Sequence, residues 1–81
     1  MRIATLNCNG IRSAARKGFY DWLPTQGIDV LCLQETRCSD EDVAEALFRP
    51  EGYTSHWLHA EKKGYSGVAI YARRPPDSVL Y

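Results

Sequence analysis

An uninterrupted apolar run at residues 30–33 leads directly into two polar residues, Gln34 and Glu35. Apolar residues at successive positions are typical of a strand covered on both faces, as parallel strands are inside α/β sheets. In such sheets, ligands bind in the crevice beyond the carboxyl ends of the strands. The run therefore predicts a buried strand over residues 28–34 that brings the carboxylate of Glu35 to a binding edge. The alternative is a carboxylate that merely ends a strand and faces solvent.

A shorter strand and a helix are predicted ahead of this run. Residues 2–6 form a short apolar segment, and residues 7–10 tolerate the positive φ angles of a turn. Ser13 is placed to cap a helix over residues 14–23, which should end before Pro24. The apolar stripe of this helix consists of Phe19, Trp22 and Leu23.

The order strand, helix, strand makes the two strands parallel. Crossovers of this length are right-handed in nearly all known cases and join parallel neighbours. The first strand is expected to end at about Asn7. Asn7 and Glu35 should therefore leave the sheet at the same edge.

The rest of the chain predicts one more helix and a hairpin. Residues 39–42 supply a helix cap and three acids. The apolar face of this second helix would consist of Val43, Ala44 and Leu47. Residues 53–60 and 67–73 are rich in aromatic and β-branched residues and predict antiparallel strands around a loop at 61–66. Residues 78–81 resemble the start of another strand. The fold class is therefore α/β, with one mixed sheet and two helices.

Composition limits the size and the class of the protein. Eighty-one residues make one small domain at most, and such chains bury only about 60% of the surface that they expose when unfolded. Ten basic and ten acidic residues give no net charge, so no nucleic-acid or membrane partner follows from charge alone. Three cysteines without CxxC spacing argue against a disulfide framework or zinc ribbon and favour a reducing compartment. No signal peptide or membrane span is evident, and we expect a cytoplasmic protein.

Several polar residues near the shared edge are candidates for binding. The amide oxygen of Asn7 suits a hard ion such as Mg²⁺, although turn formation would also explain an Asn here. Asn9 repeats this chemistry with weaker support. Arg12, Arg16 and Lys17 follow the edge and would suit phosphates, with a solvated helix face as the alternative.

Two further groups of residues have less specific interpretations. Residues 62–65 place two lysines and an aromatic ring in the hairpin loop, which suits a nucleic-acid backbone and equally a soluble loop. His56 and His59 are three apart in a strand, so they face opposite sides and cannot readily share a metal. We interpret both histidines as structural.

Three stretches together resemble a known family. They are LNCNGIRS at residues 6–13, DVLCLQET at residues 29–36 and GYSGVAIY at residues 64–71. In order and spacing they are similar to the N-terminal part of the exodeoxyribonuclease III and apurinic/apyrimidinic endonuclease family, within the endonuclease/exonuclease/phosphatase superfamily. The resemblance spans essentially all 81 residues.

The resemblance implies specific roles for matching residues. Glu35 matches the glutamate that binds Mg²⁺, or Mn²⁺ in its place, and Asn7 matches the asparagine that helps to arrange this catalytic metal site. Asn9 stands where some members have a metal-associated aspartate, and Arg37 stands where many have lysine. The residues at DNA-contacting positions are Arg12, Ser13, Lys17, Gly64 and Tyr65.

The resemblance also implies a parent enzyme larger than this chain. The family fold is a four-layer α/β sandwich, and residues 1–81 match its N-terminal half. The later tyrosine, the Asp-x-Asn pair and the terminal Asp-His pair of the family do not occur in the sequence. The parent is expected to be a monomeric DNA repair hydrolase, active on abasic sites and 3′ ends of double-stranded DNA, with this chain inactive alone.

Two other functions occur on the same scaffold. One is a non-catalytic RNA-binding regulator of the catabolite repression control type, which the presence of Glu35 disfavours. The other is a phosphoinositide phosphatase, which the GYSG motif at residues 64–67 disfavours.

Overall fold

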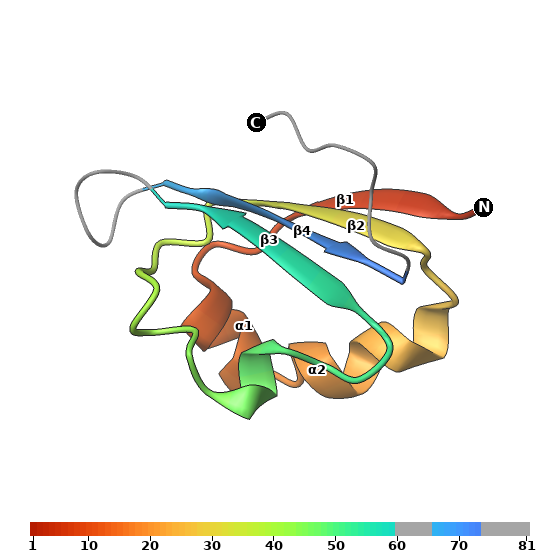
Figure 1. Ribbon diagram of the computed structural model, residues 1–81, viewed down its shortest axis with the longest axis horizontal. Helices are drawn as coiled ribbons and strands as arrows, with labels where there is room; N and C mark the ends of the chain where they lie inside the picture. The colour runs from red at the N-terminus through yellow and green to blue at the C-terminus, as the bar shows by residue number, and fades with distance from the viewer. Residues whose placement is uncertain (60–65, 74–81) are drawn as a thin grey trace.

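A four-stranded mixed sheet organises the chain (Figure 1). The computed structural model describes residues 1–59 and 66–73. The strands lie in the order β1 (Ile3–Asn7), β2 (Val30–Gln34), β4 (Val68–Ala72) and β3 (Thr54–Leu58). β1 and β2 are parallel, while β4 is antiparallel to both β2 and β3. The predicted α/β class, the parallel pair and the antiparallel hairpin strands are thus confirmed.

The helix predicted over residues 14–23 is two short helices in the structure. These are α1 (Ile11–Arg16) and α2 (Phe19–Trp22), and a 3₁₀ turn, η1 (Leu23–Gln26), follows directly. Gly18 separates them with φ 94° and ψ 18°, a left-handed conformation that interrupts the helix. The prediction of one helix was therefore wrong, because a single glycine between two apolar segments redirects the chain.

The predicted capping residue and the predicted stripe also need correction. Gly10, not Ser13, occupies the N-cap position of α1, and no side chain caps that helix. Phe19 and Leu23 are buried, but Trp22 is 42% exposed.

No α-helix forms over residues 39–48. Ser39 does not cap a helix: its backbone nitrogen and its hydroxyl both donate to Asp42 Oδ2, at 2.9 and 3.1 Å, and the backbone nitrogen of Asp42 donates to the Ser39 carbonyl oxygen at 3.1 Å. The chain then forms turns and a short 3₁₀ helix, η2 (Ala46–Phe48). Val43 and Phe48 are the buried residues of this segment, and Leu47 is exposed. Because Val43 and Phe48 are five positions apart, their burial does not follow a helical stripe, and the predicted second helix was wrong.

The core lies between the sheet and the helices, all of which cover one face (Figure 1). Tyr71 of β4 is fully buried at its centre, where its hydroxyl donates to the carbonyl oxygen of Phe48 at 2.6 Å. The hydroxyl of Tyr20 lies 2.6 Å from that of Tyr71. The buried cluster comprises Ile11, Phe19, Leu23, Ile28, Leu31, Leu33, Cys38, Val43, Phe48, Ala69 and Tyr71.

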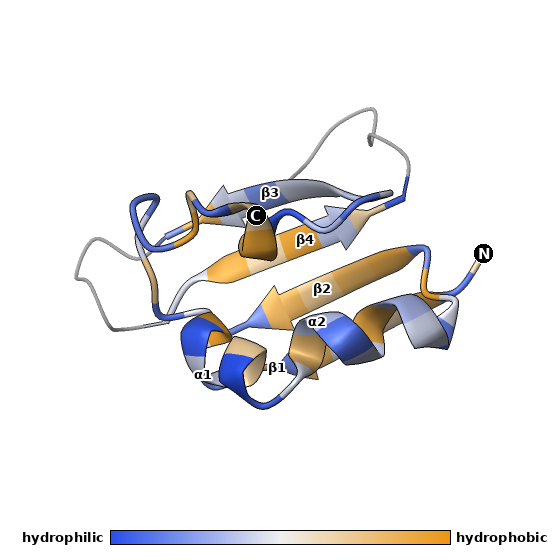
Figure 2. Cartoon of the chain, turned by 90° about the horizontal axis from the view of Figure 1, so that it is seen from below, coloured by the Kyte–Doolittle hydropathy of each residue, from blue (hydrophilic) through white to orange (hydrophobic). Residues whose placement is uncertain are grey.

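The opposite face of the sheet is apolar along its central strands β2 and β4 and has no helix over it among the described residues (Figure 1). In Figure 2, β2 and β4 are coloured as hydrophobic along most of their length. One row across the open face consists of Thr5, Cys32, Ile70 and His56. At its margins, Ile3 is 64% exposed and Leu58 is 49% exposed. Alternation in the strands thus buries one set of side chains and leaves an apolar set open.

This open face predicts self-association of the 81-residue chain. Contiguous apolar surface favours association, because removing it from water is favourable by roughly 25 cal/mol per Å². Leu58→Lys should shift the chain toward monomer in size-exclusion chromatography with light scattering. Ala44→Lys adds the same charge at an exposed turn and should change little. A wild-type chain that stays monomeric at high concentration would contradict the prediction.

Candidate active site

Asn7 and Glu35 meet at one edge of the sheet, as predicted. Asn7 ends β1 and pairs in register with Gln34, the last residue of β2, so Glu35 is the next residue beyond the edge. The amide Nδ2 of Asn7 donates a hydrogen bond to Glu35 Oε2. Asn7 Oδ1 accepts from the backbone nitrogen of Asn9 at 3.0 Å, which fixes the amide in the turn after β1. The parallel strand pair therefore places an amide and a carboxylate in direct contact.

Arg37 is a second donor to the same carboxylate. Its Nη2 lies 2.8 Å from Glu35 Oε1, and both side chains remain partly exposed. Hydrogen bonds from Asn7 first and Arg37 second hold the pKa of Glu35 below its ordinary value of 4.5. Glu35 is therefore a charged acceptor at neutral pH. Arg37 was singled out only as standing where many family members have lysine, and its contact with Glu35 was not predicted.

Backbone strain is concentrated around this edge. Four described residues other than glycine have positive φ angles, namely Asn9 (48°), Glu35 (54°), Arg37 (51°) and Ser66 (41°). Such conformations are costly for residues with a side chain and persist only where the surrounding structure enforces them. Their gathering at one edge marks it as a candidate functional site.

Backbone hydrogen bonds enforce this strained geometry from two sides. Gly10 N donates to Glu35 O at 2.7 Å, and Ile11 N donates to Thr36 O at 2.9 Å. On the other side, Arg37 N donates to the carbonyl oxygen of Ser66 at 2.7 Å. Thr36, between the two ends, is fully buried. Residues 35–37 are thus held between the start of α1 and the segment that leads into β4.

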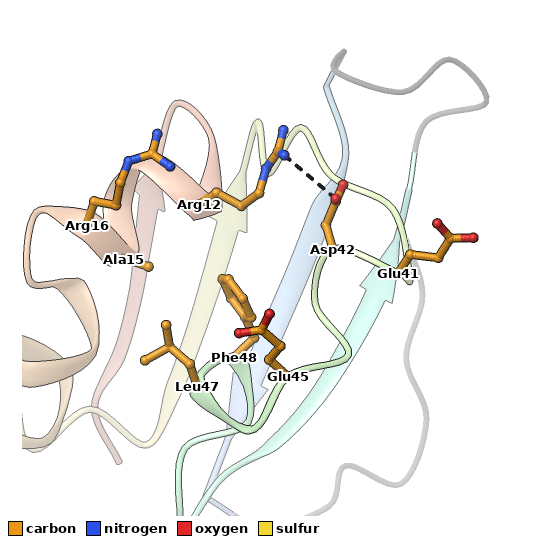
Figure 3. Close-up of a pocket in the computed structure, with 8 residues that line it drawn as sticks. All are labelled: Arg12, Ala15, Arg16, Glu41, Asp42, Glu45, Leu47 and Phe48. Atoms are coloured by element: carbon orange, nitrogen blue, oxygen red, sulfur yellow. Dashed lines mark ion pairs between the residues drawn. The ribbon is translucent and has the colours of Figure 1, made fainter.

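Arg12 lies over a cavity lined by acids as well as bases (Figure 3). Arg12 Nη1 is 3.7 Å from Asp42 Oδ1, and half of the Arg12 side chain is exposed. The cavity has a volume of about 410 Å³. Its lining comprises Arg12, Ala15, Arg16, Glu41, Asp42, Glu45, Leu47 and Phe48. The predicted phosphate-binding arginine is therefore paired with a carboxylate.

The other predicted DNA-contacting residues are placed differently. Lys17 is exposed and lines a second, more apolar cavity of about 400 Å³ that also reaches Asn7 and Trp22. Ser13 is half-buried in α1. Gly64 and Tyr65 lie outside the described residues.

His59 joins two segments near the site. Its Nε2 is 2.8 Å from Asp40 Oδ1, its Nδ1 is 3.8 Å from Cys38 Sγ, and its ring stacks on that of Trp57. Burial raises the pKa of the Cys38 thiol, so the thiol is not a ready nucleophile. These contacts agree with a structural role for His59.

The oxygen ligand at this edge of the sheet suits a hard divalent cation. The Glu35 carboxylate offers oxygen ligands, whereas Asn7 Oδ1 already accepts from the backbone nitrogen of Asn9 and Asn7 Nδ2 faces Glu35. Mg²⁺ commonly uses one or two carboxylates and completes its shell with water and substrate phosphate. Across residues 1–59 and 66–73, no group of three or more His, Cys, Asp or Glu side chains could hold a metal ion. Glu35 is thus the anionic ligand that the described part of the site offers.

Comparison with known proteins identifies the family. The family model described as endonuclease/exonuclease/phosphatase matches residues 4–81. The chain belongs to this family. A solved AP endonuclease from Archaeoglobus fulgidus matches all of the chain with a TM-score of 0.82 and 36% identity, over 31% of its own length.

Curated relatives have related names. The exodeoxyribonuclease of Bacillus subtilis is 39% identical over all of this chain, and the DNA repair nuclease APEX1 of Danio rerio is 37% identical. The chain spans 31% and 27% of these two relatives, less than a third of their length. The resemblance inferred from the sequence is confirmed.

In the described part of the chain, no helix is long and apolar enough to cross a membrane.

The pKa of Glu35 is expected to rise when its donors are removed. Asn7→Ala should raise it most and Arg37→Ala less, because each deletes a hydrogen bond to the charged form. A folded-state pKa below the unfolded value stabilises the fold above about pH 4.5, and this contribution is lost as the pH falls through the lower value. Carbon-13 NMR titration of the Glu35 carboxyl measures its pKa in the wild type and in each variant. Gln26→Ala, which removes an amide elsewhere, serves as control.

Proposed function

We propose that this chain contributes to Mg²⁺-dependent hydrolysis of DNA phosphodiester bonds in repair, at abasic sites and at 3′ ends. The observation that supports this most is the Asn7–Glu35 pair at the ends of two parallel strands. The pair occurs in a chain similar along its whole length to AP endonucleases and exodeoxyribonucleases. The proposed partner is double-stranded DNA, bound by a cytoplasmic enzyme that acts as a monomer.

The residues of the edge have distinct tasks in this proposal. Glu35, charged at neutral pH, holds the metal, and Asn7 fixes the orientation of the carboxylate. When bound there, Mg²⁺ (or Mn²⁺) neutralises phosphate charge and stabilises the leaving oxyanion. The clamped backbone of residues 35–37 keeps the carboxylate in place, so that little reorganisation is needed when substrate arrives.

The DNA backbone is proposed to run from the edge toward α1. Lys17 lies on the cavity that includes Asn7, so its ammonium group can reach a phosphate next to the site. Arg12 can contact another phosphate by exchanging Asp42 for it. Ser13, Gly64 and Tyr65 are proposed to add contacts to the duplex.

A chimera tests the catalytic proposal. The chain alone should not cleave duplex DNA, because within residues 1–59 and 66–73 the side chains bonded to Glu35 are those of Asn7 and Arg37, and neither can act as a base. General acid–base catalysis is worth roughly 10²–10⁴-fold. Replacing the matching 82-residue stretch of the Bacillus subtilis exodeoxyribonuclease with this chain should restore Mg²⁺-dependent cleavage. Glu35→Gln should lower kcat of the chimera by about 10²-fold or more. Duplexes with recessed 3′ ends or one abasic site are suitable substrates.

Matched controls make the result specific. Glu51→Gln removes the same charge at an exposed turn and should retain activity. A folded chimera that is inactive, or that cleaves equally well with Glu35→Gln, would contradict the proposed role. Cleavage by the chain alone that Glu35→Gln abolishes would overturn the prediction and show that residues 1–81 suffice for catalysis.

Binding of DNA by the chain should be weak and depend on salt. With about three cations at phosphates, the slope of log affinity against log salt concentration should be roughly −3. Arg12→Ala with Lys17→Ala should reduce both affinity and slope in fluorescence anisotropy. The control is the double variant Arg2→Ala with Arg49→Ala. It removes two positive charges from the segments before β1 and β3 and should reduce affinity less than the Arg12 and Lys17 double variant does. Tight binding that is insensitive to salt would refute the phosphate contacts.

A further inference from the structure

Both oxygens of the Glu35 carboxylate already have a donor within the chain. Asn7 donates to Oε2 as a neutral amide, whereas Arg37 approaches Oε1 at 2.8 Å as a cation. Arg37 is also fixed through its backbone, since its nitrogen donates to Ser66 O at 2.7 Å and its φ angle is 51°. The structure thus builds a positive charge into the place where a divalent cation would bind.

We propose that Arg37 is a positioning residue that weakens cation binding at Glu35 until a phosphate enters the site. This inference rests on the proposed function, because it takes Glu35 to be the metal ligand. The guanidinium and the metal compete for one carboxylate and repel each other. Metal binding is therefore weak in the free protein and stronger when a phosphate is present.

Two effects of Arg37 on metal affinity oppose each other. It orients the carboxylate, which favours binding, and it repels a doubly charged ion, which disfavours binding. The orientation does not depend on Arg37 alone, because Asn7 holds the other oxygen and the backbone of residues 35–37 is hydrogen-bonded on both sides. Repulsion therefore outweighs orientation, and loss of the guanidinium should tighten metal binding.

A phosphate changes this balance. A guanidinium presents its donors in a fork that matches phosphate oxygens, and 43% of the Arg37 side chain is exposed. An incoming phosphate diester can therefore accept from Arg37 while it contributes oxygen ligands to the metal. Phosphate and metal should then each raise the affinity for the other by the same factor, because such coupling is reciprocal.

Mn²⁺ binding tests the inference without any catalytic assay. The probe is MnCl₂, with free Mn²⁺ measured by electron paramagnetic resonance, in the chain and in a Leu58→Lys background that limits association. Arg37→Ala should bind Mn²⁺ about fivefold more tightly, and Arg37→Lys should stay close to wild type. Arg16→Ala, which removes the same charge from α1, should have a clearly smaller effect. Dimethyl phosphate should raise Mn²⁺ affinity in wild type but not in Arg37→Ala.

The outcomes separate this inference from the proposed function. If Glu35→Gln abolishes Mn²⁺ binding but Arg37→Ala leaves it unchanged or weaker, the role of Arg37 is wrong and the metal site stands. If Glu35→Gln binds Mn²⁺ as wild type does, the metal site itself is wrong. An effect of Arg16→Ala equal to that of Arg37→Ala would show a general charge effect and overturn the inference. Circular dichroism of each variant verifies that the fold is retained.

Discussion

The hydrogen bonds that hold residues 35–37 in place are the constraint on which the site depends. They join the turn after β1 to β2 on one side and the segment before β4 on the other. Without them, the positive φ angles of Glu35 and Arg37 would relax, and the two side chains would lose their common geometry. The strain is local, and the surrounding sheet balances it because all three strands involved are paired along their length.

The core supports this edge from below. Tyr71 lies at its centre and contacts three aromatic neighbours edge to face, while its hydroxyl satisfies the carbonyl group of Phe48. Burial raises the pKa of Tyr71 far above its ordinary value, so the hydroxyl remains a neutral donor. A rigid platform of this kind keeps strand ends at fixed positions, and a binding edge requires that precision.

The sequence predicts the edge better than the helices. The apolar run before Glu35 and the crossover length are properties of whole segments, and they correctly placed Asn7 beside Glu35. The helix errors came from local backbone choices: Gly18 adopts a left-handed φ, and Ser39 with Asp42 closes only one turn. The Arg37 contact was missed because positive φ at residues other than glycine leaves no pattern in the sequence. The available signal was the position of Arg37 two residues after Glu35, directly beyond a buried strand, which could have predicted an ion pair between them.

The charge distribution bears on how a chain without net charge could approach DNA, its proposed partner. Arg12 lies 3.7 Å from Asp42, with 50% of the Arg12 side chain but only 12% of the Asp42 side chain exposed. Solvent around the half-exposed guanidinium weakens this contact. In the proposed complex with DNA, Arg12 would exchange this contact for a phosphate, while Asp42 keeps the hydrogen bonds that it accepts from Ser39. Arg37 is paired with Glu35 in a similar way, and in our proposal it turns to a phosphate when the substrate enters the site. Internal pairing thus balances the charges of Arg12 and Arg37 in the free chain, and in the proposed complex both cations would become available to phosphates.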